Sequence, residues 1–248
     1  RVFQVLAAIA LAIILPLVLS TYQPSPQTSS ESTATPDSTT NGEWSVPLAL
    51  RSIQFWSLFF SRMVGSVGTM LIVTHQVAHV VDIGYSPIRA ATVFGIMALV
   101  SAAGRVAFGY IADLLTKAIA YTLNIACAVV GVVALTLATD TSQPWLLYVY
   151  IGGFVISFGS RAVILSAIAA DIFAGRGFGT IFGLSVVSVG CGGALGAWMG
   201  GALHDVTGNY LMSFTVANLL LVFSVILVWL TGLAWMRQVD RRLWSAPG

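Results

Sequence analysis

The chain has 248 residues, of which 57% are hydrophobic and only 8% charged, whereas soluble domains carry about a quarter charged residues. This composition excludes an ordinary soluble domain and indicates a protein of the lipid bilayer. The net charge of +2 is small and dispersed along the chain. A nucleic-acid partner, which needs a concentrated basic surface, is therefore not expected.

Seven apolar runs are long enough to cross a bilayer, which takes about 20 residues each. They cover residues 2–20, 53–80, 89–111, 118–139, 145–170, 178–203 and 211–236. The sequence therefore predicts an all-α membrane protein with seven transmembrane helices.

The first run stands apart from the other six. Residues 21–46 follow it and are rich in Ser, Thr and Pro, which is typical of a flexible linker. We expect residues 1–20 to be the last transmembrane helix of a truncated N-terminal half, with five more spans upstream. Residues 47–236 then form a six-helix bundle, and residues 237–248 form a tail.

The basic residues indicate the orientation of the bundle. Six spans put the linker and the tail on one side of the membrane, and that side collects Arg51, Arg105, Lys117, Arg176, Arg237, Arg241 and Arg242. The other side has Arg1 and Arg89. Because Lys and Arg are concentrated in cytoplasmic loops, the linker and the tail are expected to be cytoplasmic.

The six-span part contains an internal repeat with a displacement of 92 residues. Gly104, Gly109 and Asp113 return as Gly196, Gly201 and Asp205. The same displacement relates the start of the second span, at residue 53, to that of the fifth, and the start of the fourth span, at residue 118, to that of the seventh. Two three-helix repeats of opposite orientation are implied, and such inverted repeats are typical of secondary transporters.

The stretch GRVAFGYIADLLTK, residues 104–117, places Arg105, Gly109 and Asp113 on one helix face. It resembles the cytoplasmic signature loop of the major facilitator superfamily, G-x-x-x-D-[RK]-x-G-[RK]. Gly109, Asp113 and Lys117 match, while Leu114 and Thr116 depart from the pattern. The segments THQVAHVVDIGYSP, DIFAGRGFGTIFGL and GALHDVTGNY resemble bacterial carriers related to monocarboxylate transporters and oxalate/formate antiporters.

The resemblance implies the C-terminal half, spans six to twelve, of a carrier in a bacterial inner membrane. Such a half works with the N-terminal half of the same carrier by alternating access. The implied cargo is a small organic anion such as a monocarboxylate, coupled to protons. The resemblance also implies a gating role for the signature-loop residues Arg105, Gly109, Asp113 and Lys117.

Arg62 and Arg161 lie near the middle of their spans, where an arginine facing lipid costs at least about 2.5 kcal/mol. All nine acidic residues lie outside the middle of the spans. One interpretation is that the missing half or backbone carbonyls supply the partner. The other is that each guanidinium binds the carboxylate of a substrate.

His75, His79 and Asp82 share one helix face near the outer end of their span. A hydrated helix end and a metal site are both conceivable for this spacing. Since no carboxylate is expected mid-span, a histidine is the best local candidate for coupling protons, with His75 the deepest. His204 and Asp205 are expected in a surface turn.

The run 178–203 is rich in glycine. Gly192, Gly196 and Gly200 are spaced four apart, which lets helix backbones touch. Static packing explains such a row, and an easily bent helix that takes part in gating is the second possibility.

Two other functions stay open from the sequence: an exporter of neutral or cationic hydrophobic compounds, and a membrane scaffold or sensor that transports nothing. An enzyme is not expected, because the sequence has no H-E-x-x-H, no paired carboxylates and no G-x-S-x-G. No cofactor or metal is expected either.

Overall fold

The computed structural model describes residues 44–244, except for the side chains at position 93 and beyond residue 232. Residues 1–43 and 245–248 lie outside the described part. The expected first span, residues 1–20, and all but the last residues of the linker fall there and stay predictions.

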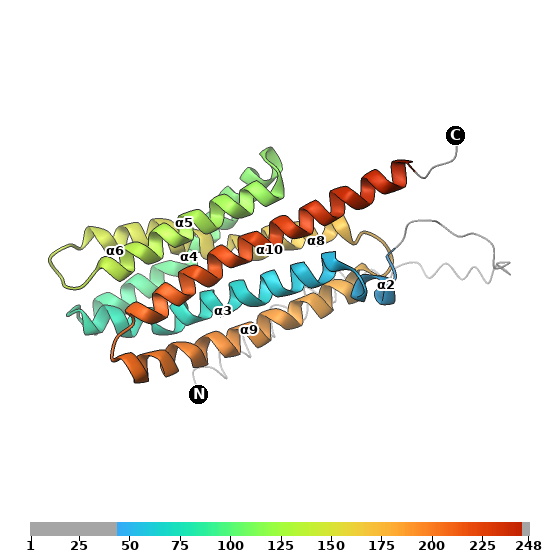
Figure 1. The fold of residues 1–248 in the computed structure, drawn as a ribbon. Coiled ribbons are helices and arrows are strands. Elements are labelled where there is room, and N and C mark those ends of the chain that lie inside the picture. The colour runs from blue at the N-terminus through green and yellow to red at the C-terminus, as the bar shows by residue number, and fades with distance from the viewer. Residues whose placement is uncertain (1–43, 245–248) are drawn as a thin grey trace, which may run out of the picture. The chain divides into compact units, whose positions relative to one another are not determined.

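Within residues 44–244 every regular element is helical (Figure 1). The helices are α2 Val46–Leu50, α3 Ile53–Asp82, α4 Pro87–Leu114, α5 Lys117–Leu137, α6 Trp145–Tyr150, η1 Ile151–Val155, α7 Ile156–Phe158, α8 Ser160–Ile172, α9 Phe178–Thr207 and α10 Leu211–Trp244. We call the run from α6 to α8, Trp145–Ile172, the Arg161 span. The all-α membrane class is confirmed: six helices in the described part are long and apolar enough to cross a bilayer.

Polar residues set where the helices begin and end. Ser52, Ser86 and Thr116 precede α3, α4 and α5, and each side chain accepts a hydrogen bond from the first turn, at 3.2–3.4 Å. Pro87 follows Ser86 in the first turn of α4, where a missing N–H costs nothing. Gly208 ends α9 with a φ of +71°, a conformation that glycine adopts freely.

The packing follows the pattern expected of two repeats. Helix α3 packs against α9 and α10, while the Arg161 span packs against α4 and α5 (Figure 1). The displacement of 92 residues maps α3 onto the Arg161 span, α4 onto α9, and α5 onto α10. The displacement therefore exchanges the contacts of α3 with those of the Arg161 span, as two inverted repeats would.

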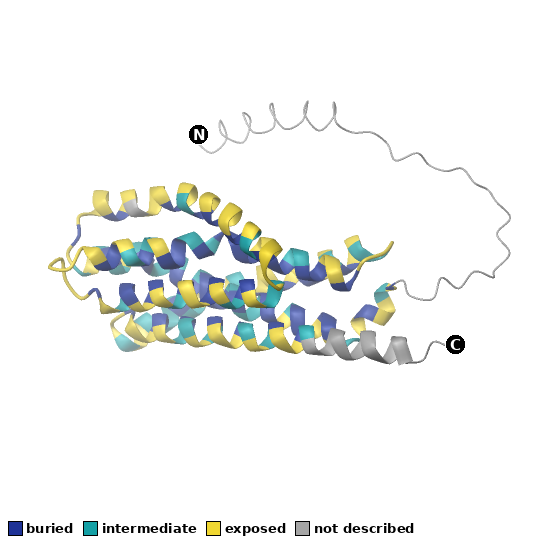
Figure 2. Ribbon diagram, turned by 90° about the horizontal axis from the view of Figure 1, so that it is seen from above, coloured by how far each residue is buried: buried dark blue, intermediate teal, exposed yellow. Residues whose placement is uncertain are grey.

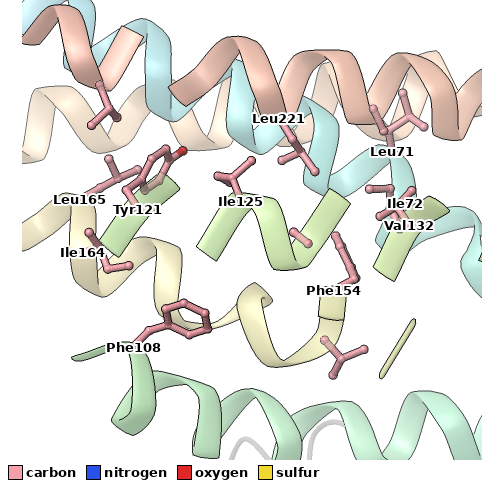
Figure 3. Packing of buried hydrophobic residues seen from close by; sticks show 14 of the residues in the cluster. Leu71, Ile72, Phe108, Tyr121, Ile125, Val132, Phe154, Ile164, Leu165 and Leu221 are labelled. Carbon is pink, nitrogen blue, oxygen red and sulfur yellow. The ribbon is translucent and has the colours of Figure 1, made fainter. Parts of the chain in front are cut away.

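The core of the bundle is apolar. Figure 3 shows Tyr121, Ile125, Phe154, Ile164 and Leu165 meeting between the helices, and all five are buried. Figure 2 shows exposed residues along the outward faces of the helices, and many of these residues are large and apolar, such as Leu99, Val187 and Leu219. Hydrocarbon surrounds a membrane protein, so these outer side chains need no water-facing polarity.

The glycine row of α9 lies on the surface that meets α3. A Cβ added to Gly192 would lie 2.4 Å from the carbonyl oxygen of Met63, and one added to Gly196 would lie 2.3 Å from that of Val67. The backbones of the two helices therefore touch along this seam, and any larger side chain would separate them.

Candidate functional site

Three arginines lie at similar depth in the bundle. Arg62 is nine residues beyond Ile53, and Arg161 is eleven residues before Ile172. At 1.5 Å per residue, both are about 13–17 Å from the same end of the bundle, or roughly half of a 30 Å hydrocarbon core.

Arg105 has this depth as well, which corrects the expectation that it lies with the cytoplasmic basic residues. Helix α4 does not end at residue 111 but continues to Leu114, so Arg105 is nine residues inside it, or about 13 Å. The side chain is exposed and has no hydrogen-bond or ion-pair partner among the described residues. An exposed arginine at this depth marks a face of α4 that meets protein or water, because facing lipid there is costly.

Arg161 is buried, with 6% of its surface exposed. Its Nη1 donates a hydrogen bond to the hydroxyl oxygen of Thr69, which is the repeat-equivalent position 92 residues earlier. Its Cζ lies 5.5 Å from the centre of the Phe154 ring. Two of its buried nitrogens, Nε and Nη2, have no partner in the described structure.

Arg62 repeats this arrangement on α3. It is 5% exposed, and its Cζ lies 5.0 Å from the centre of the Phe182 ring on α9. The same two atoms, Nε and Nη2, are buried without a partner. Each arginine therefore packs against an aromatic ring and keeps the same edge of its guanidinium unpaired.

The free edge determines what these arginines can bind. Nε and Nη2 point two parallel N–H groups in one direction, which matches the two oxygens of a carboxylate. A buried charged donor without a partner costs more than the 1–3 kcal/mol of a neutral one. Every carboxylate whose side chain is described is exposed, namely Asp82, Asp113, Asp140, Asp171 and Asp205. The described part of the chain thus presents two buried cations and no anion for them.

The Arg161 span is irregular next to its arginine. Residues 151–155 form a π-helical turn that includes Phe154, and the regular α-helix is interrupted for one residue at Gly159, whose backbone angles (φ −77°, ψ −25°) stay helical. A Cβ on Gly159 would lie 2.6 Å from Nε of Arg105. The side chain of Arg105 therefore packs directly against the backbone of the Arg161 span, and only a glycine at position 159 leaves room for it. Interrupted helices are frequent at functional sites and in the substrate sites of carriers. The sequence analysis missed this interruption, for which Gly152, Gly153 and Gly159 were the available signal.

All three histidines of the chain gather around Tyr210. The ring centres of His75, His79 and His204 lie 5.5, 6.0 and 4.3 Å from that of Tyr210. Burial first, then the charges of Asp82 and Asp205, raise the pKa of Tyr210. Sequence reasoning grouped His75, His79 and Asp82 but assigned His204 to a separate turn. The cluster joins α3 to α9, and this long-range contact has no local sequence signal.

His75 and His79 also form hydrogen bonds to the backbones of neighbouring helices. Nε2 of His75 lies 3.2 Å from the carbonyl oxygen of Ala197 on α9, and Nε2 of His79 lies 3.1 Å from that of Leu135 on α5. A carbonyl can only accept, so each Nε2 carries the hydrogen. The remaining nitrogen of each ring, Nδ1, then carries no hydrogen in the neutral ring.

The signature-loop residues do not form one contact. Lys117 forms an ion pair with Asp171, which ties the start of α5 to the end of α8. Asp113 is exposed in the last turn of α4, and a Cβ on Gly109 would meet nothing within 4 Å. The structure therefore brings Lys117 to Asp171 rather than to Asp113.

A bundle of six apolar helices with two arginines buried at mid-depth is the architecture expected of a membrane transport protein. The sequence profile of the Major Facilitator Superfamily matches residues 1–165, and the chain belongs to this superfamily. Among curated proteins, it is 32% identical to monocarboxylate transporter 13 of Bos taurus over 160 residues, which are 63% of this chain and 37% of the relative. It is 31% identical to monocarboxylate transporter 13 of Rattus norvegicus over 160 residues, 63% of this chain and 36% of the relative.

Family membership makes the chain an integral membrane protein of a transporter family and not an enzyme. The described part has six spans, which is the content of one half of such a carrier, here the expected C-terminal half. The chain spans little more than a third of the relatives it matches. Both relatives are mammalian, so they lend no support to a bacterial subgroup or a bacterial inner membrane.

Proposed function

We propose that the chain is the C-terminal half of a secondary transporter for a small organic anion, such as a monocarboxylate. One observation carries the proposal: Arg62 and Arg161 each keep Nε and Nη2 buried and unpaired. A carboxylate fills such an edge with two charge-assisted hydrogen bonds. The names of the mammalian relatives agree with this class of cargo.

Arg105 supplies the first contact in this mechanism. Because it is exposed at the depth of the buried pair, an incoming anion meets it before Arg161. The interruption at Gly159 lies between the two arginines and gives the Arg161 span a place to bend. Small movements there would expose or cover the free edge of Arg161.

Alternating access would come from rocking this bundle against an N-terminal half, with the substrate held between them. The glycine seam between α9 and α3 and the Lys117–Asp171 ion pair are the contacts that such a movement would strain. In this proposal the linker and the C-terminus are cytoplasmic, as the distribution of basic residues indicates.

Proton coupling is assigned to the histidine cluster, with His75 as the first candidate and His79 and Asp82 beside it. Histidine is the side chain whose charge ordinarily changes between pH 5 and 8. The ring of His75 lies against Gly200, whose added Cβ would be 2.3 Å from the ring. A proton on this ring would therefore act directly on the seam between α3 and α9.

The proposal is tested in cells that express the complete gene, with internal pH recorded while mono- and dicarboxylates are added. We expect one anion to acidify the cytoplasm with wild type and with Arg89→Gln, whose arginine is exposed at the start of α4. Arg161→Gln should abolish the response at equal expression. If Arg161→Gln responds like wild type, Arg161 is a structural charge, and an exporter of hydrophobic compounds becomes the better hypothesis.

A further inference from the structure

A cavity lies where α4, α5, α8 and α10 meet near the end of the bundle, and its wall contains none of the three arginines. Its volume is about 510 Å³. Apolar side chains form most of its wall, including Leu115, Ile119, Ile168, Ile172 and Val228. The cavity is partly open, and exposed apolar side chains such as Leu115 and Ile119 line it. An apolar wall that is open at the membrane surface matches the acyl chain of a lipid.

The ammonium group of Lys117, at the edge of the cavity, has one N–H donor that forms no hydrogen bond with the described residues. Lys117 has three N–H donors; one serves the ion pair with Asp171, and another reaches the carbonyl oxygen of Ala167 at 3.4 Å. The third remains for an anionic or ester oxygen. Trp229 lines the same cavity and donates its indole N–H to the Thr122 hydroxyl at 3.0 Å, which fixes the ring in the wall.

The position of the cavity suits the boundary between acyl chains and headgroups. Lys117 is the first residue of α5, and Asp171 lies in the last turn of α8. Tryptophan and lysine are both enriched at this boundary.

The two ends of the bundle differ in charge. At the cavity end of residues 44–244, the basic residues Arg51, Lys117, Arg176, Arg237, Arg241 and Arg242 outnumber Asp113, Asp171 and Asp240. At the other end Asp82, Asp140 and Asp205 outnumber Arg89. The cavity end therefore attracts anionic headgroups, and a basic residue near the membrane surface contributes about 1 kcal/mol to that attraction.

We propose that this cavity is a binding site for an anionic phospholipid, with one acyl chain inside and the headgroup phosphate accepting a hydrogen bond from Lys117. The bound lipid would join the ends of α5, α8 and α10. The site shares no residue with the proposed anion-binding residues Arg62, Arg105 and Arg161. It does include the Lys117–Asp171 ion pair, which the proposed rocking movement would strain.

Gly232 offers a way to fill the cavity without disturbing the fold. It lines the cavity, and a Cβ added to it would meet nothing within 4 Å. Gly232→Leu should therefore occupy the space of the acyl chain, and leucine also favours the helix over glycine. Gly95→Leu is the matched control, because Gly95 on α4 likewise has no neighbour within 4 Å.

Native mass spectrometry of the purified chain, supplied with equal amounts of phosphatidylglycerol and phosphatidylcholine, measures the bound lipid directly. Wild type and Gly95→Leu should retain one phosphatidylglycerol per chain, and Gly232→Leu should retain at least tenfold less. Lys117→Gln should still bind lipid but lose the preference for phosphatidylglycerol. Size-exclusion profiles confirm that each variant is folded.

The proposal is overturned if Gly232→Leu retains as much lipid as wild type. It is also overturned if wild type retains no lipid, or if it does not prefer phosphatidylglycerol. Lipid binding is counted here without any transport, so a negative result leaves the anion carrier untouched.

Discussion

Gly104 lies where α4 touches the main chain of α7, and its replacement by alanine is predicted to be destabilising. The added Cβ would lie 1.8 Å from the carbonyl oxygen of Ile156, whereas real Cβ contacts are at least 3.0 Å. The two backbones must therefore separate by more than 1 Å. Overpacking a tight contact costs about 1–3 kcal/mol, and a clash with main chain belongs at the upper end.

A cost of about 3 kcal/mol corresponds to a melting temperature about 6–12 °C lower in a chain of this size. Scanning fluorimetry of the purified protein in detergent measures the melting temperatures of wild type and Gly104→Ala. Gly109→Ala is the control, because it lies five residues along the same helix and its Cβ meets nothing within 4 Å. That variant should melt at or slightly above the wild-type temperature, since alanine favours a helix by about 1 kcal/mol. Equal melting temperatures for the two variants would refute the close contact between α4 and α7.

Three further predictions follow from the same contacts. Arg161→Lys keeps the charge but loses the two parallel N–H groups of Nε and Nη2, so the KM for anion uptake should rise about tenfold or more at equal expression. An unchanged KM would show that these two N–H groups do not bind the carboxylate. Gly200→Ala displaces the His75 ring, 2.3 Å from the added Cβ, and should weaken the dependence of uptake on external pH while uptake at fixed acidic pH persists. Tyr121→Phe removes the 2.9 Å hydrogen bond to Ser224 and should lower the melting temperature by about 2–4 °C; no change would show that the bond contributes nothing.

The sequence predicted the spans well, because each described span is one long apolar run between polar or glycine-containing turns. The ends of three helices were expected too early. Helix α4 continues from 111 to Leu114, α9 from 203 to Thr207, and α10 from 236 to Trp244, so the helix includes most of the expected tail. The added turns contain polar residues such as Asp113 and Asp205, because backbone hydrogen bonding does not depend on hydropathy. Arg105 already lay six residues inside the expected run, or about 9 Å, and the longer helix brings it to about 13 Å.

The candidate site was predictable only in part. A charged residue inside an apolar run is visible in the sequence, which is why Arg62 and Arg161 could be named. Their surroundings depend on contacts between helices, namely Arg161 with Thr69 on α3 and Arg62 with Phe182 on α9, and on the packing of Arg161 against Phe154 within its own span. The meeting of His204 with His75 at Tyr210 has the same long-range origin.

The central claim is that the unpaired guanidinium edges of Arg62 and Arg161 bind a carboxylate. The most direct measurement is the NMR signal of the arginine Nε–H groups in the ¹⁵N-labelled protein while pyruvate is added. Signals assigned with Arg62→Gln and Arg161→Gln should shift in a saturable way, while that of exposed Arg89 stays in place. If neither buried signal moves at saturating pyruvate, or if Arg89 moves equally, the two arginines do not form a monocarboxylate site.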